Sequence, residues 1–121
     1  MATARVVFRF QSADPEIHEI TDIENAAEAM ASSSKVLRAV TIDNAANGAV
    51  TYVKFWNSAG PTVGTTAPDM ILMCPASVAR TYIFPEGITF GTACEVAALT
   101  TGGTAGTTSP TSACNIQVIL E

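Results

Sequence analysis

The sequence predicts an all-β fold, an antiparallel β-sandwich of jelly-roll-like type with one short N-terminal helix. From residue 44 onward, short apolar runs rich in β-branched residues alternate with loops of Gly, Pro, Ala, Thr, Ser and Asn. The clearest runs are residues 50–56, 70–74 and 115–120, and their length and punctuation are typical of strands in an antiparallel sandwich. The loops carry almost no charge, which favours a packing and assembly protein over an enzyme.

The N-terminal third has a different composition. Residues 4–11 alternate between apolar and other positions and predict a strand, in which Arg5 and Arg9 would discourage unwanted edge pairing. An acidic stretch follows over residues 14–28, and Thr21 and Glu24 have capping-box spacing. We therefore expect a short amphipathic helix over residues 22–31. The predicted organisation is an N-terminal strand and acidic arm over residues 1–34, followed by a β-sandwich domain over residues 35–121.

The remaining strands follow from turn signals. Residues 36–43 and 49–56 are predicted to form a hairpin, because the Asn47-Gly48 step between them is the strongest short hairpin signal. Residues 70–74 form a strand ended by Pro75, and residues 79–84 form one ended by the turn triplet that begins at Pro85. Two more strands are expected over residues 92–100 and 113–120.

Composition excludes several functional classes. Only 14% of the residues are charged while 48% are hydrophobic, so the surface is neutral and suits burial against other subunits. The net charge of -5 argues against binding to nucleic acid and against a polybasic membrane-surface protein. We find no apolar run long enough for a membrane span and no signal-peptide pattern. The odd count of three cysteines then predicts reduced, buried thiols at Cys74, Cys94 and Cys114.

No residue pattern predicts catalysis, cofactor binding or metal binding. His18 is the one histidine, and no serine lies in a G-x-S-x-G elbow. The cysteines lack the close C-x-x-C pairs of zinc sites, and the acidic stretch lacks a calcium-loop pattern. The Gly-rich residues 102–108 lack the lysine of a phosphate loop. The sequence therefore predicts a protein that is not an enzyme.

Two groups of residues are candidates for an interface. Tyr52, Lys54 and Trp56 alternate with Val53 and Phe55, so the first three share the outer face if the other two face the core. An outward Tyr-Trp pair would serve a protein interface. The alternatives, in order, are a strand buried on both faces and a sugar-stacking surface. The second group lies in the N-terminal strand and comprises Arg5, Phe8, Arg9 and Phe10.

Several phrases over residues 40–121 resemble a family of small β-sandwich proteins encoded by tailed bacteriophages. The phrases are Ile42-Asp43-Asn44 with Asn47, Tyr52-Val53-Lys54-Phe55, residues 61–69 (PTVGTTAPD), Phe84-Pro85-Glu86-Gly87-Ile88, residues 100–108 (TTGGTAGTT) and Pro110-Thr111-Ser112-Ala113. Members of this family are virion structural components of the head-decoration or tail-associated kind. The resemblance implies no catalytic residues.

The resemblance and the composition together give a functional expectation. The chain is expected to be a capsid decoration or cement protein that stabilises an assembled phage head. The alternative is a carbohydrate-binding or adhesion module of a tail or head fibre. The expected partners are further copies of itself, as a homotrimer, and the major capsid protein or another virion protein, with no nucleic acid, membrane or cofactor. The expected location is the virion, after synthesis in the host cytoplasm.

Overall fold

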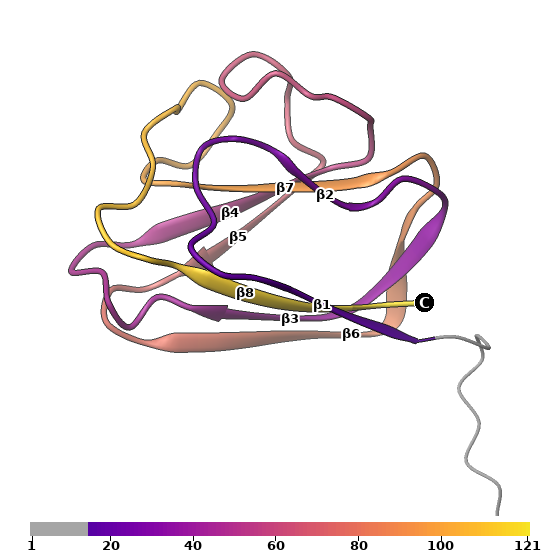
Figure 1. Ribbon diagram of the computed structural model, residues 1–121, viewed down its shortest axis with the longest axis horizontal. Helices are drawn as coiled ribbons and strands as arrows, with labels where there is room; N and C mark the ends of the chain where they lie inside the picture. The colour runs from indigo at the N-terminus through magenta and orange to yellow at the C-terminus, as the bar shows by residue number, and fades with distance from the viewer. Residues whose placement is uncertain (1–14) are drawn as a thin grey trace, which may run out of the picture.

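The computed structural model describes residues 15–121, in which eight strands form two four-stranded antiparallel sheets (Figure 1). The first sheet has the order β1-β8-β3-β6 and the second has the order β2-β7-β4-β5. The strands of the first sheet are β1 (Glu16–Ile20), β8 (Asn115–Leu120), β3 (Lys35–Asp43) and β6 (Ala79–Phe90). Those of the second are β2 (Glu28–Ala31), β7 (Cys94–Leu99), β4 (Thr51–Trp56) and β5 (Met70–Cys74). Of the connections between these strands, only that from β4 to β5 stays within one sheet.

One hydrophobic core lies between the two sheets. Its buried side chains alternate along each strand with side chains of the outer faces, as the strand period of two requires. Phe55 of the second sheet and Phe90 of the first meet in this core, with ring centroids 6.2 Å apart. Both sheets therefore contribute to a single buried layer (Figure 1).

The strands with clear sequence signals are confirmed. Strands β3, β4, β5, β7 and β8 fall where the apolar runs and turn residues predict them, within two residues at each end. The prediction for the thiols is also confirmed, because Cys74, Cys94 and Cys114 are all buried and free.

The predicted helix over residues 22–31 is wrong. Asp22 has a positive φ of 58°, and residues 28–31 form β2. The backbone groups here bind distant strands: Ile23 N–H donates to Cys114 O at 2.8 Å, and Glu24 O accepts from Ala98 N–H at 2.9 Å. Ile23 and Met30 are buried in the core, so their spacing reflects a chain that crosses from one sheet to the other.

The predicted hairpin of residues 36–43 and 49–56 is also wrong, because β3 and β4 belong to different sheets. Neither Asn47 nor Gly48 has the positive φ of a two-residue hairpin turn. Asn44 is instead fully buried, and its amide donates to Ala49 O and to Pro75 O, both at 3.0 Å. Its carbonyl oxygen accepts from Thr51 Oγ1 at 2.7 Å. These bonds hold an arch between the sheets.

Strand β6 continues past Pro85, where the sequence predicts an end. Residues 84–87 bulge out opposite Arg38, and pairing resumes between Ile88 and Leu37. The guanidinium of Arg38 donates to Pro85 O at 3.1 Å across the bulge. Pro85 is tolerated because β6 is an edge strand, and a proline at a bulge removes no ladder hydrogen bond.

The predicted domain boundary at residue 34 does not divide the described chain. Strand β1 pairs with β8 of the first sheet, and β2 pairs with β7 of the second. Residues 16–31 are therefore part of the same folded unit as residues 35–121. The strand predicted over residues 4–11 lies outside the described residues. Among residues 15–121, no helix is long and apolar enough to cross a membrane.

Candidate interaction surfaces

The outer face of β4 is covered, although the sequence favours an interface there. Tyr52, Lys54 and Trp56 do share this face, but Lys54 is 0% exposed, Trp56 is 1% exposed and Tyr52 is partly buried. The described structure thus matches the alternative in which β4 is buried on both faces. The other four candidates, Arg5, Phe8, Arg9 and Phe10, lie outside the described residues.

Two loops cover β4. Trp56 Nε1 donates to Thr66 O at 2.9 Å, which brings the loop of residues 57–69 over the strand. A Cβ atom at Gly102 would lie 3.3 Å from the Tyr52 ring, so the loop of residues 100–112 passes closely over Tyr52. Figure 1 shows both loops rising above the second sheet, one after β4 and one before β8. Sequence composition predicts these loops but not where they lie.

Lys54 is an anomaly beneath these loops. Its cross-strand neighbours are Ala97 and Ile71, both apolar. Within residues 15–121 its Nζ atom is buried without a hydrogen-bond partner, and this burial lowers the pKa of the amine. A neutral amine is a nucleophile, but a fully covered one meets no substrate. We therefore assign Lys54 no chemical role.

The outer face of the first sheet is open and carries an apolar row. Cross-strand register aligns Ile17 of β1, Ile119 of β8, Ala39 of β3 and Ile83 of β6 across all four strands. Ile17 is 65% exposed and Ile83 is 71% exposed, the two highest values among the large hydrophobic residues described. We call these four residues the apolar row. Sequence reasoning misses the row, because each strand contributes one member and only the register brings the four together.

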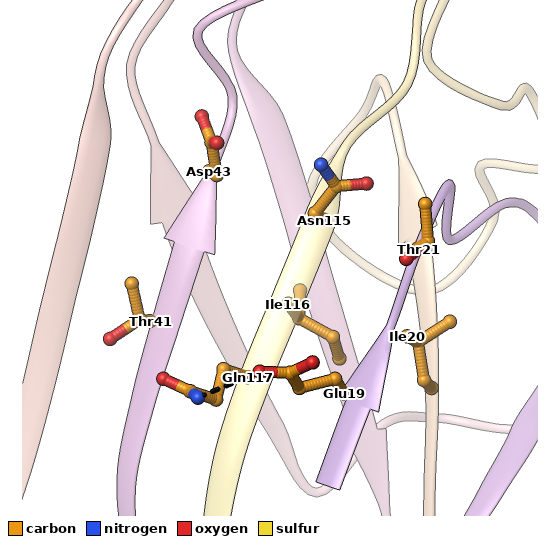
Figure 2. Close-up of a pocket in the computed structure, with 8 residues that line it drawn as sticks. All are labelled: Glu19, Ile20, Thr21, Thr41, Asp43, Asn115, Ile116 and Gln117. Atoms are coloured by element: carbon orange, nitrogen blue, oxygen red, sulfur yellow. Dashed lines mark hydrogen bonds between the residues drawn. The ribbon is translucent and has the colours of Figure 1, made fainter.

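A polar row runs beside the apolar row. Glu19, Gln117, Thr41 and Thr81 are aligned across the same four strands. Gln117 Nε2 donates to Glu19 Oε1 at 2.9 Å, and the hydroxyls of Thr41 and Thr81 are 2.9 Å apart. Asp43 and Asn115 follow in the next register position. Figure 2 shows Glu19, Gln117 and Thr41 side by side, with Asp43 and Asn115 above them.

All of these polar residues except Thr81 line a shallow pocket of about 270 Å³. Its two carboxylates, Glu19 and Asp43, come from strands on either side of β8 (Figure 2). No group of three or more His, Cys, Asp or Glu side chains in residues 15–121 is arranged to hold a metal ion. The pocket therefore gives this face an acidic margin.

A charged cluster lies at the edge formed by β1. Glu16 accepts hydrogen bonds from His18 Nε2 at 2.9 Å and from Lys35 Nζ at 3.1 Å. These two contacts, with the Lys35 charge, hold the pKa of Glu16 below its ordinary value. The sequence suggests a surface histidine among carboxylates, and the structure gives His18 such a neighbour. No nucleophile completes a catalytic arrangement within the hydrogen bonds described for this cluster.

Comparison with known proteins adds no relative. No protein-family model matches the chain, and no curated protein matches it.

Proposed function

We propose that this chain is a non-enzymatic structural protein of a tailed-bacteriophage particle, and that it decorates the assembled head. The observation that carries the proposal is the outer face of the first sheet, on which an apolar row crosses four strands and ends in the exposed Ile17 and Ile83. Exposed apolar patches bordered by polar residues mark protein interaction sites. The phage assignment itself depends on the sequence phrases described above.

The strand order supports the same proposal. Sheets of order β1-β8-β3-β6 and β2-β7-β4-β5 are those of an eight-stranded jelly roll. Jelly rolls occur in viral capsid and lectin domains, among others. We propose that this chain is a jelly roll that acts in the virion, as a homotrimer bound to the major capsid protein or another virion protein.

The carbohydrate-binding alternative has less support. Sugar stacking needs an exposed aromatic face, and Trp56 is buried beneath the loop of residues 57–69. Among the described residues, the exposed large hydrophobic side chains are aliphatic. A protein interface therefore suits the open face better than a sugar site does.

Band stoichiometry in purified particles tests the proposal. Virions of a phage that encodes this chain would be separated by gel electrophoresis, and the chain would be quantified against the major capsid protein. A head decoration protein is expected at a copy number comparable to that of the capsid protein. Absence from the particles, or a few copies confined to purified tails, would refute head decoration.

A further inference from the structure

We infer that the apolar row on the first sheet binds residues 4–11 of a neighbouring copy of this chain. This inference deepens the proposed function, since it names the contact that would join copies into a ring. It starts from the row itself, which leaves Ile17 and Ile83 in contact with solvent on either edge of the sheet. An apolar row of this kind requires a covering partner.

Charge decides against direct packing of one such face on another. Residues 15–121 contain ten acidic residues, and of their four cations Lys54 is buried. Lys35 and Arg38 are paired with Glu16 and Glu121. The fourth cation, Arg80, aligns with the buried Ile42 and donates to the Tyr82 hydroxyl at 3.5 Å, so it is not a member of the outer-face rows. Glu19 and Asp43 therefore give the face next to the apolar row a negative charge, and two such faces would repel one another.

Residues 4–11 have the complementary chemistry. They contain the two remaining cations of the chain, Arg5 and Arg9, and no acid. Their apolar residues at alternate positions are Val6, Phe8 and Phe10. A segment that is both cationic and apolar fits an apolar row with an acidic margin, because each of its two properties has a counterpart there.

The length of the apolar row also agrees with the length of the segment that would cover it. Four neighbouring strands span three gaps of about 4.8 Å, so the row extends over about 14 Å. In an extended segment, the four steps from Val6 to Phe10 cover about 13 Å. Three alternate side chains would thus lie along the whole row. Arg5 and Arg9 occupy intervening positions and start on the opposite side of the segment, so their long side chains would have to fold back around it to reach the polar row.

The neighbouring copy is favoured over the segment's own sheet. Pro15 immediately precedes β1, and a proline disfavours the helical backbone region for the residue before it. This restriction favours a segment that continues away from β1 over one that folds back on Ile17 of its own chain, and the double variant below separates the two. A segment from one copy on the sheet of the next makes a head-to-tail contact, and such contacts form a ring when the rotation between copies closes.

Cysteine cross-linking between two full-length variants tests the inference. Phe8→Cys protein and Ala39→Cys protein would be mixed in equal amounts and oxidised mildly, and the products would be identified by mass spectrometry. Phe8 would lie over the middle of the row, so we expect a disulfide between position 8 of one chain and position 39 of the other. The native thiols do not interfere, because all three are buried.

A matched control and a double variant make the result decisive. Val78→Cys replaces an exposed apolar residue outside the row and should cross-link at least tenfold less than Ala39→Cys. Equal cross-linking at both positions, or none at either, would overturn the inference. So would a Phe8→Cys/Ala39→Cys double variant that closes within one chain while the mixture gives no product.

A second measurement does not depend on oxidation. Light scattering of full-length Ile83→Lys and Phe8→Asp variants should show a loss of self-association, while Val78→Lys retains that of the original chain. Retained association in Ile83→Lys and Phe8→Asp would overturn the inference. Both experiments use purified chain without particles, so their failure leaves head decoration standing, and absence from virions leaves this contact standing.

Discussion

At the scale of single residues, Lys54 shows that the fold tolerates a side chain whose burial is energetically unfavourable. A buried amine without a partner loses its hydration and gains nothing in return. The surrounding side chains Trp56, Ala97 and Leu99 are all buried and would pack equally well against an apolar chain of the same length. The lysine therefore destabilises the fold relative to a methionine of similar shape.

Replacing this lysine should stabilise the protein. Lys54→Met is expected to raise the free energy of unfolding by about 2 kcal/mol at pH 7, because it removes an unpaired polar group from an apolar layer. Urea denaturation followed by circular dichroism measures the change. The control is Lys35→Met, which removes a partly exposed lysine paired with Glu16 and should lower stability by less than about 1 kcal/mol. A destabilised Lys54→Met variant would show that the amine has a partner after all.

The same substitution has a predicted pH dependence. Burial lowers the pKa of Lys54 in the folded state, so between that pKa and about 10.4 the unfolded chain binds a proton that the folded chain does not. Stability of the original chain therefore rises with pH across this window. The advantage of Lys54→Met should be largest at low pH and should shrink as the pH approaches 10. The difference between the two proteins cancels the titration of the cysteines. An advantage that does not change with pH would contradict the lowered pKa.

Asn44 carries the arch between β3 and β4. Asn44→Ala removes its bonds to three backbone carbonyls and leaves the buried groups of Asn47 and Thr51 without their bond to its carbonyl oxygen. The expected loss is about 3 kcal/mol, since each buried group left unpaired costs about 1–3 kcal/mol. Asn25→Ala is the matched control, because its side chain donates to Thr107 O at an exposed position. Thermal unfolding of both variants tests the difference, and equal midpoints would show that the arch does not depend on Asn44.

At the scale of elements, the sequence predicts the strands that contain their own signals. Strand β5 falls at residues 70–74 as predicted, because an apolar run is ended there by Pro75. Strand β1 is missed because it lies in an acidic stretch, and β2 is missed because its four residues follow a capping-box spacing that favours a helix. Their pairing depends on β8 and β7, which come much later in the chain, as in the pair Ile20 and Ile116. Local patterns do not contain that information.

The same reasoning explains what was predictable about the candidate surfaces. The period of two places Tyr52, Lys54 and Trp56 on one face of β4, and the structure has them there. Whether loops cover that face depends on contacts such as that of Trp56 with Thr66, which no local pattern specifies. The apolar row could not be predicted from the sequence, because no local pattern marks any of its four members. Only the sheet register places them on one surface.

Truncation tests the placement of β1 and β2. A chain without residues 1–34 loses an edge strand from each sheet and the buried side chains of Ile23 and Met30, so it should fail to fold. A chain without residues 2–13 keeps all eight strands and should retain the circular dichroism spectrum and cooperative unfolding of the full chain. If the shorter truncation unfolds, residues 2–13 are needed for the fold itself. If the chain without residues 1–34 folds, β1 and β2 are not required for the fold.

At the scale of the whole molecule, the three thiols report on the integrity of the core. Burial raises the pKa of Cys94 and of Cys114 to about 12 and also raises that of Cys74. The thiolate is the reactive form, so maleimide at pH 8 should label none of them in the folded protein and all three in denaturant. Mass spectrometry counts the labels. Rapid labelling of one thiol without denaturant would reveal local opening at that site.

These shifts also give an alkaline limit to stability. A thiol whose pKa is higher in the folded state contributes stability that is complete below about pH 8.5, the pKa of an unfolded cysteine. That contribution is lost as the pH rises toward 12. The folded chain should therefore unfold at lower denaturant concentration at pH 11 than at pH 8. A Cys94→Ala variant should show a smaller loss over the same range.

The distribution of charge over the molecule bears on its oligomeric state. The described body is acidic with an exposed apolar row, and two further arginines of the sequence, Arg5 and Arg9, precede it. We expect a homotrimer, in which head-to-tail contacts close after three copies. Light scattering at micromolar concentration should give three times the mass of the 12.5 kDa chain. An Arg5→Ala/Arg9→Ala variant should dissociate at lower dilution than the original chain, because it would lack the charges that we propose are attracted to Glu19 and Asp43. A stable monomer in solution and on particles would show that the open face meets another virion protein directly, without any contact between copies.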